Sequence, residues 1–177
     1  MEEALTLIEK TIEEHKAILQ RFQAMERVTN DAEAINSLEK AKDAFMPGRF
    51  DQKGIPAELG ELVNSVDEGL QAHFDREETA LLNAFENYGD RELASAFHSL
   101  LLEHEGLRER LTQSKDHLAK LTSGELSRHQ WEATGYDMRA HISQTRKLLE
   151  AHAAGEKELL LQLRDRLAGE SRETTLA

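Results

Sequence analysis

The chain has 177 residues and a formal net charge of −12, from 34 acidic and 22 basic residues, and this length suits one domain with a substantial core. The surplus of negative charge repels phosphate groups, so nucleic acid and anionic membrane surfaces are disfavoured as partners. The chain has eight histidines and no cysteine. The lack of cysteine excludes disulfides, zinc sites with cysteine ligands, cysteine-bound iron–sulfur clusters and a cysteine nucleophile.

The first predicted helix covers about Glu2–Val28. Its apolar residues recur every three or four positions and share one face: Leu5, Ile8, Ile12, Leu19 and Phe22. The opening MEEALTLIEK is acidic where a signal peptide is basic, and no apolar run approaches the length of a membrane span. We therefore expect a cytoplasmic protein with no membrane partner.

A connector over Thr29–Pro56 separates the first long helix from the second. We expect a short extra helix within it, over about Asp31–Phe45, because the proline and glycine of Met46-Pro47-Gly48 stop a helix. Pro56 suits the first turn of the second long helix, where its missing N–H costs no hydrogen bond. Two roles stay open for the connector: a cover for one end of the protein, or a contact with a partner.

Three more long helical segments follow. The second long helix ends near Tyr88-Gly89, and Asp90 is predicted to cap the third, which ends at Ser123-Gly124. The fourth covers about Ser127–Leu167, and we expect the polar tail over residues 169–177 to fray.

The predicted fold is therefore all-α. Four amphipathic helices, three of them joined by tight turns, favour an antiparallel up-down four-helix bundle with a short extra helix in the first connection. We expect a single domain over residues 1–177.

The two halves of the chain resemble each other. The pattern L-x-A-H-x-x-x-E-x-x-x-L-L begins at Leu70 and again at Leu149, 79 residues later. The dipeptides Glu14-His15 and Glu103-His104 also match, each followed by an apolar residue, an arginine and a second apolar residue at the same distances. The repeated unit is a helical hairpin with a histidine on its first helix and His-x-x-x-Glu on its second.

Six residues of this repeat interrupt the apolar faces of the helices: His15, His73, Glu77, His104, His152 and Glu156. Residue counts from the predicted turns place His15, His73 and His104 at similar heights. His152 lies further from the start of its helix, and an overhang or bend over Ser123–Gly135 would absorb that difference. A histidine and a glutamate four residues apart lie about 40° apart around a helix, so both point towards one centre. An ionised glutamate on an apolar face is costly unless it is paired or bound to metal. No lysine or arginine shares these faces at that level, with Arg108 as the one exception. We therefore predict a metal site in the middle of the bundle.

The ligand types narrow the choice of metal. Imidazole and carboxylate without thiolate suit iron or manganese well and zinc adequately. Four histidines and two glutamates divide into two metal ions, each held by two histidines and both bridged by the two glutamates. A lone histidine on an apolar face is usually a hydrogen-bonded core residue, and an isolated His-x-x-x-Glu is usually a surface pair. Their repetition at matching heights favours metal.

The other four histidines are predicted to lie outside the cluster. His98 and His117 point away by helical phase, and His129 lies near the third loop. His141 shares the face of His152 but precedes it by eleven residues, about 16 Å along the axis, and we interpret it as a core or channel histidine.

At these residues the sequence resembles the hemerythrin-like family, the HHE cation-binding domains, over essentially the whole chain. The resemblance rests on the order His, His-x-x-x-Glu, His, His-x-x-x-Glu: His15, His73/Glu77, His104, His152/Glu156. It implies a four-helix bundle with a non-haem di-iron centre, in which the two glutamates and an oxo or hydroxo group bridge the irons. It assigns His15 and His73 to one iron and the other two histidines to the second.

Two positions differ from the oxygen-carrying hemerythrins. Those proteins have His-x-x-x-His on the third helix, where this chain has Arg108 four residues after His104, and they end with His-x-x-x-x-Asp instead of His152-x-x-x-Glu156. Loss of a histidine leaves a coordination position open or filled by water, which implies a more labile and more reactive site. The pattern is closer to the branch that includes proteins for the repair of iron centres, which usually carry an N-terminal segment with cysteines.

The leading hypothesis is a di-iron protein that binds or reacts with O2, NO or peroxide in sensing or stress defence. The alternative is a non-catalytic protein that binds O2 or stores iron, and a third is a structural bundle with zinc or no metal. A ferritin-like centre fits less well, because that class uses Glu-x-x-His on two helices and a lone glutamate on the others. The sequence leaves open whether the protein is an enzyme, its redox partner, and whether it is a monomer or a homodimer.

Overall fold

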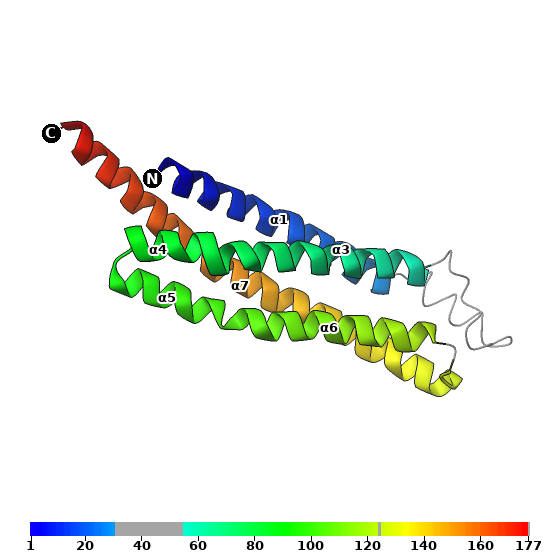
Figure 1. Cartoon of the computed structure of the whole chain (residues 1–177). Coiled ribbons are helices and arrows are strands. Elements are labelled where there is room, and N and C mark those ends of the chain that lie inside the picture. Colours follow the sequence, from blue (N-terminus) through cyan, green and yellow to red (C-terminus); the bar gives the residue numbers. More distant parts are fainter. Residues whose placement is uncertain (31–54, 124, 177) are drawn as a thin grey trace.

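The computed structural model describes residues 1–30, 55–123 and 125–176, and within these ranges every regular element is a helix. The elements are α1 (Glu2–Asn30), α3 (Ile55–Arg76), the π-helical turn η2 (Glu77–Leu81), α4 (Leu82–Tyr88), α5 (Arg91–Leu101), α6 (Glu103–Thr122) and α7 (Arg128–Leu176). Figure 1 shows four long antiparallel rods: α1, then α3 with η2 and α4, then α5 with α6, then α7. The predicted all-α four-helix bundle is confirmed.

Each rod packs against two neighbours. α1 contacts α3 and α7, and α6 contacts the same two helices from the other side of the bundle. α7 extends beyond the other rods at its C-terminal end (Figure 1) and continues to Leu176, through the tail that the sequence predicts to fray. This tail contains no proline to end the helix. The extra helix expected over Asp31–Phe45 lies outside the described residues. No helix in the described ranges is long and apolar enough to cross a membrane.

The apolar core is divided into two clusters along the bundle. The first contains Ile18, Phe22, Met25, Leu59, Val63, Val66, Leu70, Phe74, Leu107, Leu111, Met138, Ile142 and Leu149. The second contains Ala4, Ile8, Leu81, Ala84, Phe85, Leu93, Phe97, Leu160, Leu163 and Leu167. On every rod, the break between the two clusters falls where the sequence places the candidate ligands. The polar residues are therefore enclosed by apolar packing on both sides.

The turn between α4 and α5 is built as predicted. The Asp90 carboxylate accepts a hydrogen bond from the backbone N–H of Leu93 at 2.8 Å, which caps α5, and it also pairs with Arg166 of α7. Gly89 precedes the cap, and a Cβ atom there would lie 2.4 Å from the carbonyl oxygen of Phe85. This close approach requires glycine.

Two glycine substitutions are expected to change stability in opposite directions. Gly89→Ala forces the backbone of the turn to shift and should lower the free energy of unfolding by about 1–3 kcal/mol. Gly135 lies inside α7, where an added Cβ meets no atom within 4 Å. Gly135→Ala should therefore raise the free energy of unfolding by about 0.5–1 kcal/mol. Urea denaturation of both variants measures the difference. Equal effects of the two substitutions would contradict this account of the turn.

Candidate metal centre

The structure brings the six predicted ligands together between the two apolar clusters. α1 provides His15, α3 provides His73, η2 begins with Glu77, α6 provides His104, and α7 provides His152 and Glu156. Their exposed fractions are 6% for His15, 2% for His152, 1% for His73 and His104, and 0% for the two glutamates. All four rods therefore direct polar side chains into one buried region.

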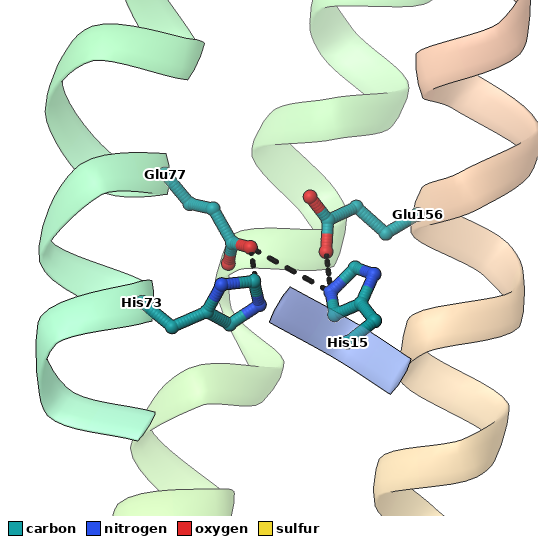
Figure 2. A group of neighbouring side chains, drawn as sticks. All are labelled: His15, His73, Glu77 and Glu156. Carbon is teal, nitrogen blue, oxygen red and sulfur yellow. Dashed lines mark ion pairs between the residues drawn. The ribbon is translucent and has the colours of Figure 1, made fainter. Parts of the chain in front are cut away.

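Four of these side chains form a first group, drawn in Figure 2: His15, His73, Glu77 and Glu156. His15 Nε2 lies 2.8 Å from Glu156 Oε2 and 3.7 Å from Glu77 Oε1. His73 Nε2 lies 2.6 Å from the same Glu77 oxygen. The donor atoms of this group all lie within 4.8 Å of one another, which is the spacing of ligands around a single ion.

A second group shares Glu77 with the first and adds the remaining two histidines, His104 and His152. His104 Nε2 lies 3.2 Å from Glu77 Oε2 and 3.2 Å from His152 Nε2. Because Glu77 directs Oε1 to one group and Oε2 to the other, its carboxylate is placed to bridge two ions. Glu156 lies in the first group and its Oε2 is 3.9 Å from His152 Nε2.

The π-helical turn η2 sets the direction of the carboxylates on the second rod. A π turn holds one residue more than an α turn and changes the phase of the side chains that follow. Within it, consecutive glutamates contact the same imidazole ring: Glu77 Oε2 lies near Nε2 of His104, and Glu78 Oε1 is 2.8 Å from its Nδ1. The sequence predicts an unbroken α-helix here, because apolar residues keep spacings of three or four on both sides of this turn.

Three further carboxylates contact the outer nitrogens of three of the histidines. Glu14 Oε2 lies 3.2 Å from Nδ1 of His73, and Glu103 Oε2 lies 3.0 Å from Nδ1 of His152. Glu78 completes the set at His104. Such outer partners fix the orientation of a ligating histidine and raise its basicity. We call Glu14, Glu78 and Glu103 the outer carboxylates.

The outer carboxylates were not predicted, although the sequence contains a signal for two of them. The Glu-His dipeptide occurs at Glu14-His15 and at Glu103-His104, in matching places of the repeat. In both cases the glutamate contacts the histidine of the next helix along the chain rather than its own neighbour: Glu14 contacts His73, and Glu103 contacts His152. Only the packing of one rod against another makes this pairing visible.

The nitrogen and oxygen atoms that these six residues direct inward suit a cation. An ionised carboxylate can only accept hydrogen bonds, so a histidine bonded to an outer carboxylate carries its proton on Nδ1 and presents a bare Nε2 to the interior. The Nε2 atoms of His104 and His152 then face each other as two acceptors 3.2 Å apart. Six more buried atoms have no hydrogen-bond partner: Nε2 of His15 and His73 and both oxygens of Glu77 and Glu156. Such a cluster of acceptors is costly without positive charge.

The pKa directions agree with this interpretation. Burial, with repulsion from Glu156, raises the pKa of Glu77 to about 8. Burial alone would raise the pKa of Glu156, but the close contact with His15 and the charges of His15, His73 and His152 hold it below its ordinary value. Burial lowers the pKa of both His73 and His152, which favours the neutral form that binds metal.

Arg108 and the remaining histidines lie outside the ligand cluster. Arg108 pairs with Glu78 and not with Glu77. His141 is half-buried, and its Nε2 lies 2.8 Å from the carbonyl oxygen of Arg110, as expected of a core histidine. His117 lies beside it with a ring-centroid distance of 5.4 Å, and His98 forms an exposed pair with Glu86. His129 is exposed.

The sequence matches the family described as Hemerythrin HHE cation binding domain over residues 6–163, which is most of the chain. The chain belongs to the hemerythrin family. No curated protein and no solved structure matches it significantly. The resemblance drawn from the order of histidines and glutamates is thus confirmed at the level of the family. As a hemerythrin HHE domain, the protein is a metal-binding four-helix bundle, with its His/Glu cluster as the candidate cation site.

Proposed function

We propose that this hemerythrin-family protein is a non-haem di-iron protein that binds or reacts with O2, NO or peroxide in sensing or stress defence. One observation carries the proposal. The inward-facing nitrogen and oxygen atoms are buried without hydrogen-bond donors, and their residues form two groups that share Glu77. Nitrogen and oxygen ligands without thiolate suit iron, with manganese or zinc as substitutes.

Each residue has a distinct part in the proposal. His15 and His73 would hold one iron, His104 and His152 would hold the other, and Glu77 and Glu156 would be the bridging carboxylates. The outer carboxylates keep the protons of three histidines on Nδ1, so that Nε2 stays available. The apolar clusters on both sides exclude water from the centre.

Among the described residues no seventh side chain joins the six candidate ligands, which supports a reactive centre. Bound iron supplies redox chemistry and coordination positions for a small ligand, which a protein ligand would otherwise fill. On α6 the position four residues after His104 is Arg108, and its guanidinium is engaged by Glu78. Each group therefore contains two histidines besides the shared Glu77, and the first group also contains Glu156.

An anaerobic titration tests the proposed function. We expect protein prepared without oxygen and reduced to hold two irons per chain and to change its absorption spectrum on addition of O2, NO or peroxide. A reactive centre consumes NO or peroxide over repeated additions, whereas a storage or carrier protein binds O2 reversibly and consumes neither. Much less iron than this, or a spectrum that none of the three molecules changes, would refute the proposal. Retention of zinc alone would favour a structural role.

A further inference from the structure

Arg108 lies one turn after His104 on α6, and its side chain is held by four contacts, one of which is an ion pair of Nη2 with Asp75 Oδ1 at 3.8 Å. Nη1 donates to Glu78 Oε1 at 2.8 Å, and Nε donates to Gln71 Oε1 at 3.1 Å. The guanidinium carbon lies 5.1 Å from the centre of the Phe74 ring, which is a cation–π contact. The positive charge is therefore held next to Glu78.

Glu78 transmits this contact to the centre. The oxygen that accepts from Arg108 is also the one that lies 2.8 Å from Nδ1 of His104. The ring of His104 is stacked on Phe74 as well, with centroids 3.9 Å apart and an interplanar angle of 15°. Its tautomer and its ring plane are both determined by neighbours, so Nε2 has little freedom to turn away from the second group of ligands.

The related half of the bundle lacks these features around His15. In the repeat, Lys157 corresponds to Glu78, Leu19 corresponds to Arg108, and Ala153 corresponds to Phe74. No outer carboxylate contacts His15 among the described residues, and its side chain is 8% exposed, against 1% for His73, His104 and His152. The two halves therefore share the ligand types, but of the two lone histidines His15 and His104 only His104 has an outer carboxylate.

We propose that Glu78, held by Arg108, is a positioning residue for His104, and that it makes the His104–His152 position the tighter of the two metal positions. Both histidines of that position have an outer carboxylate, whereas in the other position only His73 has one. The His15–His73 position is then the one that exchanges its metal. This inference rests on the proposed two-metal centre and not on its reactivity.

A titration of the full chain with Co²⁺, in competition with a chromophoric chelator, tests the proposal. The wild type binds in two steps, and Glu78→Gln should weaken the tighter step by about 10–100-fold and alter its visible absorption, because outer-shell partners contribute that much to affinity. Arg108→Leu should weaken the same step, and Arg108→Lys should restore part of the loss by returning a cation to Glu78. Glu14→Gln should weaken the other step through His73.

A double-mutant cycle distinguishes positioning from a general effect of charge or folding. In a His104→Ala background, Glu78→Gln should cost less than about twofold, whereas Glu14→Gln should keep its full effect. Glu13→Gln removes the same charge from the exposed face of α1 and should change neither step. The proposal is overturned if Glu78→Gln leaves both steps unchanged, weakens only the weaker step, or costs as much without His104. Wild-type binding of two Co²⁺ ions tests the proposed centre separately, and the O2 and NO titrations test its reactivity.

Discussion

Glu77→Gln is expected to empty the centre, with a loss of metal affinity greater than the roughly 100-fold that outer-shell partners contribute. Glu77 is the residue that both groups of ligands share, and its two oxygens face Nε2 of His73 and of His104. Glutamine keeps the size of the side chain but removes the negative charge. It also provides an amide N–H that can donate to a histidine nitrogen, so the side chain satisfies the histidines in place of a cation.

Iron content per chain and the absorption spectrum of the reconstituted protein measure this effect. Glu156→Gln should also lower the iron content, since Glu156 lies 2.8 Å from His15 in the first group. Glu158→Gln is the matched control, because Glu158 is exposed on the same helix and loses the same charge. Full iron occupancy and an unchanged spectrum in Glu77→Gln would show that the buried glutamates are structural and would contradict the ligand assignment.

The convergence of the six residues could be predicted because it depends only on helical phase and on counts of residues between turns. His15, His73 and His104 lie at similar distances from the predicted turns, and each interrupts an apolar face. A rigid helix transmits both quantities over its whole length. The repeat adds a second, independent reason, since corresponding positions of two packed hairpins meet at the same level.

Local irregularities could not be predicted in this way. The π turn at Glu77–Leu81 and the break at Leu102, between α5 and α6, each leave the helical direction intact. Leu102 keeps α-helical backbone angles, with φ of −65° and ψ of −21°. Because spacings of three and of four residues both fit an α-helix, the apolar pattern on either side of such a turn does not show where the turn lies. Such turns nevertheless decide which oxygen faces which nitrogen.

The outer carboxylates were hidden for a different reason. Glu14, Glu78 and Glu103 are partly exposed and lie among 34 acidic residues, most of which belong to ordinary solvated helix surfaces. Their partners lie on neighbouring rods, 26 to 59 residues away along the chain. Their role is therefore a property of packing between helices, which periodicity along a single helix does not contain.

The same buried acceptors that suit a metal should make the metal-free protein less stable. Glu77 is fully buried, and among the described residues its ion-pair contacts are with histidines alone. With its raised pKa, ionisation of Glu77 is more costly in the folded than in the unfolded chain. Its contribution to stability is therefore greatest below the ordinary glutamate pKa and is lost as the pH rises towards about 8.

Glu77→Met should therefore stabilise the metal-free protein while destroying the site. Replacing a buried ion pair by apolar side chains of similar volume ranges from neutral to a gain of about 4 kcal/mol. We expect a gain within that range, because burial lowers the pKa of His73 and so favours a neutral partner that leaves no buried charge behind. The gain should be larger at pH 8 than near pH 5, because only the wild type loses stability over that interval through this group. Urea denaturation in the presence of a chelator, at several pH values, measures both effects.

Phe22→Ala provides the contrast. Phe22 is fully buried in the first apolar cluster, so its truncation should lower the free energy of unfolding by about 3–5 kcal/mol at every pH.

With saturating metal, the order of stability of the wild type and Glu77→Met should reverse. Bound metal stabilises only the protein that can hold it, by about 4 kcal/mol at a thousandfold excess over the dissociation constant. Destabilisation of the metal-free protein by Glu77→Met at pH 8 would mean that this carboxylate supports the fold through the histidines. If Glu77→Met is more stable than the wild type without metal and less stable than the wild type with metal, Glu77 serves cation binding and lowers the stability of the metal-free fold.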